Sequence, residues 1–210
     1  MKLFFGSRNF FFSLFLLLSS YFALSSPELK HFHKSILKQQ RESNSIRRYY
    51  PNLGPLFEEA VLVSLLEEEK YDPERHLILQ NVKYYYDNKN NEGELDFVIV
   101  DKSQKKVISI IEVKCCWDIK SASRKARKQL GRFRRLILAQ KNPRAHTPVI
   151  SFEYEGKELF ELNSKHFFHK PNLRIITYKD ELAKEYGFET ININYCDLVE
   201  LRSSMLLIAS

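Results

Sequence analysis

The chain of 210 residues carries 33 lysines and arginines against 26 aspartates and glutamates, which gives a net charge of +7 and a pI near 9.2. This length suffices for one domain with a full hydrophobic core, and no shift of composition in mid-chain suggests two. The three cysteines, Cys115, Cys116 and Cys196, show neither a disulfide framework nor a Cys-x-x-Cys zinc pattern. The basic balance favours an anionic partner, either nucleic acid or an acidic membrane surface.

The first segment predicts a secretory signal. Basic residues precede the apolar run 10–18, and the small residues Ala23 and Ser25 stand two apart, as a signal peptidase requires. We therefore expect residues 1–25 to be cleaved and the protein to be exported, either secreted or periplasmic. The alternative is an uncleaved membrane anchor, although the apolar stretch 10–24 is shorter than the ~20 residues of a spanning helix.

Residues 26–52 are polar and charged without a sustained apolar face, so we expect an exposed lead-in or a loosely packed helix. From residue 53 the pattern predicts an amphipathic helix. Phe57, Ala60 and Val61 recur at helical intervals, and Asn52 offers a cap. We expect one domain over residues 53–210.

Three strands are predicted next, over 77–86, 94–101 and 106–114. Short polar connections separate them, so we expect antiparallel neighbours. The later elements are a basic helix over 121–140, strands over 148–154 and 173–178, and a short helix over 179–186. This order predicts an α/β fold with a mixed sheet flanked by helices.

Asp96, Glu112 and Lys114 end two of these strands, within Gly-Glu-Leu-Asp (93–96) and Ile-Glu-Val-Lys (111–114). Residues two apart in a strand share a face, so Glu112 and Lys114 point the same way. Carboxylates are hard oxygen ligands for Mg²⁺ or Mn²⁺, and a lysine beside them can orient a water or stabilise charge on a phosphate. The set favours metal-dependent phosphodiester hydrolysis, whereas Glu-x-Lys alone also arises as an exposed ion pair.

The order of elements, with Asp96 on one strand and Glu112-Val113-Lys114 on the next, resembles the PD-(D/E)XK nuclease superfamily over about residues 53–152. The resemblance implies a restriction-endonuclease-like αβββαβ core and a deoxyribonuclease that uses Mg²⁺ or Mn²⁺. It also implies that Asp96, Glu112 and the Val113 carbonyl hold the metal, and that Lys114 positions the attacking water.

Two further residues match the superfamily by their place on helices. Glu58, in Gly-Pro-Leu-Phe-Glu of the first helix, would act on the metal directly or through water, although Glu59 competes for this position. Gln129, on the helix after the third strand, would contact the substrate or the lysine. The one departure from the literal pattern is Leu95-Asp96 in place of Pro-Asp.

The segment 120–144 is the second signal, because it contains ten lysines and arginines and no aspartate or glutamate. An ordinary solvated helix would intersperse carboxylates for pairing, so contact with phosphates is favoured over a plain solvated face. The candidate nucleic-acid ligands are Arg124, Lys125, Lys128 and Arg132.

Two other functions stay open. One is a non-catalytic nucleic-acid-binding or interaction protein that retains the nuclease fold. The other is a basic peripheral membrane protein, which would use the N-terminal segment and the cationic helix but leave Asp96, Glu112 and Lys114 unexplained. The choice of DNA or RNA, and the homodimer that paired cuts would require, are not decided by the residues.

Overall fold

The computed structural model describes residues 24, 26–42, 52–86, 90–141, 150–155 and 160–209. Apart from Leu24, the predicted signal segment lies outside the described residues. The chain divides into two compact units. The first contains the described residues up to Ser64 and those from Ile191 onward, and the second contains those from Leu65 to Thr190.

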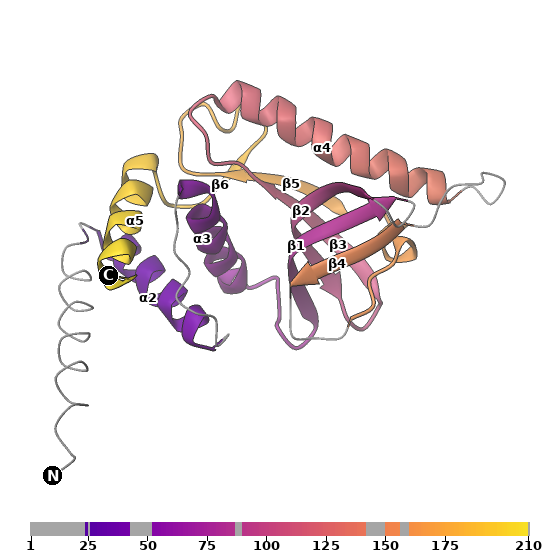
Figure 1. Ribbon diagram of the computed structural model, residues 1–210, viewed down its shortest axis with the longest axis horizontal. Coiled ribbons are helices and arrows are strands. Elements are labelled where there is room, and N and C mark those ends of the chain that lie inside the picture. The colour runs from indigo at the N-terminus through magenta and orange to yellow at the C-terminus, as the bar shows by residue number, and fades with distance from the viewer. Residues whose placement is uncertain are drawn as a thin grey trace, which may run out of the picture. The chain divides into compact units, whose positions relative to one another are not determined.

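The first unit is helical, with α2 (Pro27–Glu42), most of α3 (Leu53–Glu67) and α5 (Tyr195–Ala209). Figure 1 shows α2 beside α5, and the two helices contact each other. Helix α3 begins where the sequence predicts it, because the Asn52 side chain accepts a hydrogen bond from the N–H of Gly54 at 3.2 Å.

Helix α2 bears out the helical alternative for the lead-in, but its buried face was not expected, and α5 needs a full correction. The predicted lead-in contains a true helix whose buried residues, Leu29, Phe32, His33 and Ile36, recur at helical spacing. Helix α5 was not predicted at all. It begins at a reciprocal cap, in which the Asn194 and Asp197 side chains each accept the other's backbone N–H at 2.9 Å.

The second unit is built on a six-stranded sheet in the order β4-β1-β2-β3-β5-β6. Its strands are β1 (His76–Tyr86), β2 (Asn90–Asp101), β3 (Lys106–Val113), β4 (Ile150–Glu155), β5 (Asn172–Thr177) and β6 (Glu189–Thr190). Strands β4, β1, β2 and β3 are antiparallel neighbours, whereas β5 runs parallel to both β3 and β6. The predicted α/β architecture with a mixed sheet and the antiparallel order of its first three strands are confirmed.

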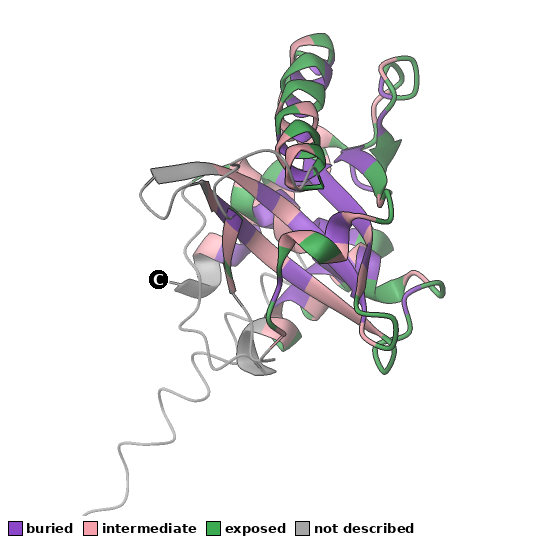
Figure 2. Ribbon diagram, turned by 90° about the vertical axis from the view of Figure 1, so that its right-hand side faces the viewer, coloured by how far each residue is buried: buried purple, intermediate pink, exposed green. Residues whose placement is uncertain are grey.

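Helix α4 (Ile119–Gln140) covers one face of this sheet (Figure 1). It begins at Asp118, whose carboxylate accepts the N–H of Ser121 at 2.9 Å. Phe133 anchors the helix, with its ring centroid 5.0 Å from Tyr84 and 5.0 Å from Phe167. Figure 2 shows buried residues through the sheet and exposed residues along the outward side of α4.

The predicted helix over 179–186 is wrong, because residues 181–187 form successive turns. The chain has only a short stretch in which to return from β5 to the parallel strand β6. Gly187 takes a φ of 78°, a left-handed conformation that glycine adopts without a steric penalty. The N–H of Phe188 then bonds the carbonyl of Ala183 at 3.0 Å and closes the turn.

Arg174 on β5 is the main charged contact of this unit and is only 5% exposed. Its guanidinium donates to Glu189 at 2.7 Å and to Glu68 at 2.9 Å, and also to the hydroxyl of Tyr71 at 2.9 Å. A buried arginine that pairs two carboxylates and a phenol links the end of α3, β5 and β6.

We expect Arg174→Met to lower the free energy of unfolding by about 2–3 kcal/mol, because it leaves two carboxylates without their shared cation. Lys70→Met is the matched control, since Lys70 also pairs with Glu68 but is 56% exposed, and it should cost about 0.5 kcal/mol or less. Urea unfolding of both variants measures the difference. Equal losses would contradict the role given to Arg174.

Candidate active site

The two predicted carboxylates meet where the β2–β3 ladder ends. The register pairs Phe97 with Ile111, so one further step along the antiparallel pair places Asp96 opposite Glu112. Both strands have a buried apolar run next to the carboxylate. A shift of the pairing by one residue would turn these apolar side chains to the other face of the sheet, so a single register is favoured. The two carboxylates are sixteen positions apart in sequence, and the hairpin between them brings them together.

Asp96 is held by the backbone of the neighbouring strand. Its Oδ2 accepts a hydrogen bond from the backbone N–H of Val113 at 2.6 Å. This side-chain bond follows directly after the last backbone pairs between β2 and β3. Burial raises the pKa of the Asp96 carboxyl above its ordinary value of 3.8, and the Val113 hydrogen bond and the charge of Lys114 offset only part of this rise. Glu94 adds to it by charge repulsion. The fold therefore makes ionisation of Asp96 less favourable than it is in the unfolded chain.

Glu112 is fully buried and forms an ion pair with Lys114, two residues further along the chain. The expectation that these side chains point the same way is confirmed. Lys114 is 22% exposed, so it connects the buried carboxylate to the surface. The electrostatic influence of Lys114 on Asp96 shows that the lysine acts on both carboxylates. Asp96, Glu112 and Lys114 therefore form one charged group at the sheet end, which we call the carboxylate–lysine site.

Strand β5 fixes the backbone of this site from its other side. The N–H of Lys114 donates to the carbonyl of Ile176 at 2.9 Å, and its carbonyl accepts the hydroxyl of Thr177 at 2.7 Å. Tyr178 likewise donates to the carbonyl of Cys116 at 2.9 Å. Sequence reasoning missed Thr177 and Tyr178, because no local pattern marks a residue that contacts a strand more than sixty positions earlier.

Gln129 reaches the site indirectly. From α4, its side-chain amide donates to the carbonyl of Glu94 at 2.8 Å. Glu94 lies two residues before Asp96 on β2 and also perturbs its pKa. In this structure Gln129 therefore positions the strand that carries Asp96, and the expected contact with substrate or lysine stays a prediction.

The predicted metal-contacting Glu58 lies half-buried on α3 in the first unit. The carboxylate–lysine site belongs to the second unit. The role of Glu58 at the metal therefore stays a prediction. Among the described residues, no three His, Cys, Asp or Glu side chains gather closely enough to form a metal cluster by themselves.

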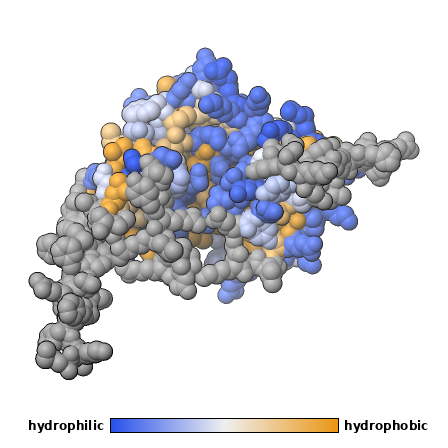
Figure 3. Space-filling model, in the orientation of Figure 1, coloured by the Kyte–Doolittle hydropathy of each residue, from blue (hydrophilic) through white to orange (hydrophobic). Residues whose placement is uncertain are grey.

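Arg124, Lys128 and Arg132 recur every four residues on α4, and all three are exposed, as is Lys125. Residues at this spacing lie in a row along a helix, so we call these four cations the basic ridge. Hydrophilic residues gather over α4 in Figure 3. The exposure of these cations on one helix leaves their predicted contact with phosphates open, and that contact stays a prediction.

The ridge approaches the site through Arg132. A Cβ atom added to Gly93 would lie 2.7 Å from a guanidinium nitrogen of Arg132, so this cation lies against β2 three residues before Asp96. Because the hydroxyl of Tyr84 also fills this space, Gly93 admits no side chain without displacing its neighbours. The glycine thus allows both groups to approach the strand closely.

Comparison with known proteins identifies no relative. No protein-family model matches the chain, and no curated protein or solved structure matches it significantly. Within the described residues, no helix is both long and apolar enough to cross a membrane.

We expect Asp96→Asn to make the metal-free protein more stable at neutral pH. The amide can still accept from Val113, and it removes a charge that burial disfavours. In the unfolded wild-type chain, Asp96 ionises near its ordinary pKa of 3.8. In the folded protein it ionises only at a higher pH, because its pKa is raised. The free energy of unfolding therefore falls as pH rises from the unfolded pKa to the folded pKa.

Urea unfolding of both proteins from pH 4 to 8 measures this difference, which should grow with pH and then level off. Glu185→Gln, an exposed carboxylate in the 181–187 turns, is the control and should show no such trend. A variant Asp96→Asn less stable than wild type at neutral pH would contradict the proposed cost of the charge.

Proposed function

We propose that this protein is a metal-dependent nuclease of the PD-(D/E)XK type that hydrolyses phosphodiester bonds of DNA. The observation that carries the proposal is the carboxylate–lysine site itself. Asp96 on β2 and Glu112 on β3 lie opposite each other where the ladder between these two strands stops, Lys114 pairs with Glu112, and a basic helix lies on the same sheet. A purely structural ion pair would not require the second carboxylate, whose ionised form is disfavoured here.

The order of elements supports a restriction-endonuclease-like core. Helix α3 precedes the antiparallel meander β1–β2–β3, which is followed by α4. Strand β5 then runs parallel to β3. A parallel neighbour of this kind requires a long crossover connection, and α4 is part of that connection. Strand β4, between α4 and β5 in the chain, is added at the outer edge beside β1.

The donors of the site fit a divalent cation. Two carboxylates and the Val113 carbonyl are hard oxygen ligands of the kind Mg²⁺ and Mn²⁺ prefer. The raised pKa of Asp96 indicates negative charge that the apoprotein compensates incompletely, and a cation would compensate it. Asp96 and Glu112 would therefore hold the metal, which when bound supplies charge stabilisation for the phosphate and a more acidic water.

Lys114 has a separate task in the proposed reaction. Its ammonium group is partly exposed while its backbone is fixed on both sides by β3 and β5. It would hold the attacking water and offset charge that grows on the phosphoryl oxygens. Overall, the water oxygen bonds to phosphorus, the bond from phosphorus to one sugar oxygen breaks, and that oxygen leaves with a proton.

The basic ridge would hold the polynucleotide. Its cations would contact the phosphate backbone, which requires positive charge but no recognition of individual bases. They are Arg124, Lys125, Lys128 and Arg132. Arg132 lies where the ridge meets β2, so it connects the bound backbone with the site. Exposed Trp117, three residues beyond Lys114, is the only tryptophan of the chain and reports on occupancy by its fluorescence.

We expect the full-length protein to cut DNA with Mg²⁺ or Mn²⁺ and not with EDTA. Asp96→Asn and Glu112→Gln should each lower the rate about 100-fold or more, because each removes a charge that stabilises the reaction. Both substitutions keep the side-chain shape and a hydrogen-bond acceptor for Val113 or Lys114. The measurement is cleavage of plasmid, linear duplex, single-stranded DNA and RNA.

Glu185→Gln serves as the matched control, and thermal unfolding checks that every variant is folded. Cutting that survives in both site variants would exclude the carboxylate–lysine site as its origin. Binding without cutting under any metal would instead favour the alternative of a non-catalytic nucleic-acid-binding protein.

We expect the double variant Arg124→Gln/Lys128→Gln to bind duplex DNA more weakly and with a shallower salt dependence. Each phosphate contact contributes about −0.9 to the slope of log K against log salt, so the slope should fall in magnitude by about 2. Trp117 fluorescence or anisotropy of labelled DNA in EDTA measures binding without cleavage. The double variant Lys165→Gln/Lys184→Gln removes the same charge from residues outside α4, and an equal effect there would show that only net charge matters.

A further inference from the structure

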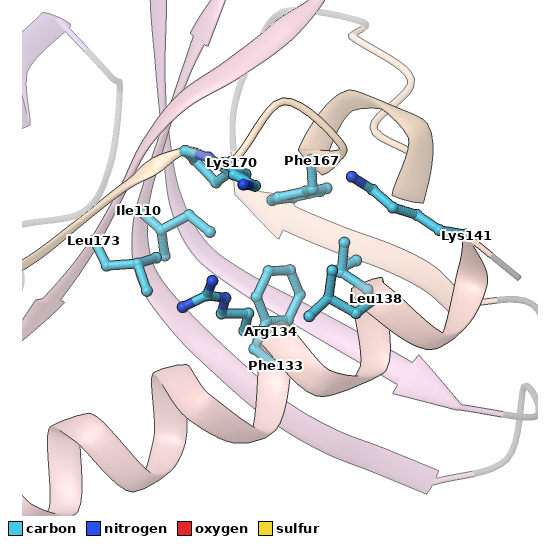
Figure 4. Close-up of a pocket in the computed structure, with 10 residues that line it drawn as sticks. Ile110, Phe133, Arg134, Leu138, Lys141, Phe167, Lys170 and Leu173 are labelled. Carbon is cyan, nitrogen blue, oxygen red and sulfur yellow. The ribbon is translucent and has the colours of Figure 1, made fainter.

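A pocket of about 160 Å³ opens in the second unit, away from the basic ridge. It lies between the second half of α4, the short helix η1 (Ser164–Phe167) and the start of β5 (Figure 4). The residues that line it are Ile110, Phe133, Arg134, Ile137, Leu138, Lys141, Phe167, Lys170, Pro171 and Leu173.

The floor of the pocket is apolar. Ile110, Phe133, Ile137 and Phe167 are each at most 4% exposed. The rings of Phe133 and Phe167 pack edge to face at 5.0 Å, which fixes the wall between α4 and η1. An apolar cavity of about 150 Å³ holds a ligand the size of benzene, so this one suits a single ring or a short alkyl chain.

The rim is cationic. Arg134, Lys141 and Lys170 line the pocket, and no carboxylate does. Lys141 is held in place, because its ammonium donates to the carbonyl of Phe168 at 2.5 Å and lies 5.1 Å from the centre of that ring. Within the part of the chain that the structure describes, no carboxylate forms an ion pair with Arg134 or Lys170. Their positive charge is available to a ligand.

We propose that this pocket binds a small amphiphilic anion, a single ring or short alkyl chain that carries one carboxylate or phosphate. The apolar part would occupy the space over Phe133 and Ile137, and the anionic group would contact Arg134 or Lys170. A neutral molecule of the same shape gains the burial but not the charge contact, and a cation meets three like charges. This site does not depend on the proposed nuclease function.

The test is titration of the full-length protein with matched probes, followed by amide chemical shifts. Phenylacetate and phenyl phosphate distinguish a carboxylate from a phosphate ligand, while phenylethanol and phenethylammonium keep the ring and change the charge. We expect an anion to bind about tenfold or more tightly than phenylethanol, the difference that one charge-assisted hydrogen bond supplies. The shifts should cluster at residues 133–141 and 167–173.

Two variants test the two parts of the pocket. Arg134→Gln should weaken the anion about tenfold and leave phenylethanol unchanged, whereas Arg135→Gln, its exposed neighbour outside the lining, should change neither. Leu138→Trp, at a side chain 47% exposed on the rim, should obstruct the pocket and weaken all probes. Equal binding of anion and cation, or binding that Leu138→Trp does not affect, would overturn the proposal.

Discussion

The constraint that organises the second unit is a pair of carboxylates on neighbouring strands, the partly buried Asp96 on β2 and the fully buried Glu112 on β3. Burial of a carboxylate is costly unless it is hydrogen-bonded or paired, and each has one main compensating partner. Val113 donates its N–H to Asp96, and Lys114 pairs with Glu112. The compensation is incomplete, as the raised pKa of Asp96 shows. A protein selected for stability alone would gain by replacing this arrangement with apolar residues, so the arrangement points to a function.

The surrounding structure keeps these partners in place. Strand β5 bonds the backbone of Lys114 through Ile176 and Thr177, and α4 bonds β2 through Gln129. These contacts come from the middle and from the last part of the second unit's sequence. They hold the ends of two strands that would otherwise separate where their ladder stops. A rigid backbone is what a site that must orient small ligands requires.

Helix α4 distributes its cations between two tasks. The stretch from Arg124 to Arg132 carries the exposed row without carboxylates, and Arg132 at its end lies against β2. The second half of the helix contributes Arg134 and Lys141 to the rim of an apolar pocket. Phe133, between them in sequence, anchors the helix in the aromatic cluster with Tyr84 and Phe167. Under the two proposals, the same basic composition would bind an extended polyanion on one stretch and a compact anion on the other.

The sequence by itself determined the strands, the start of α3 and the helix α4, because alternating or continuous apolar runs and caps are local patterns. It also placed Asp96 and Glu112 on the second and third strands, although Asp96 lies in the middle of β2 and not at its end. It failed at 179–186 and at α5, where the local composition is ambiguous and tertiary packing decides between turn and helix.

Only the tertiary structure decided what the polar side chains contact. Thr177 and Gln129 show no sequence signal for their roles, since their partners lie 63 and 35 positions away. The same holds for the pocket, whose lining comes from β3, α4, η1 and the start of β5. Hydrophobic periodicity reports on which side of an element faces the core, and it contains no information on which distant element will lie against that side.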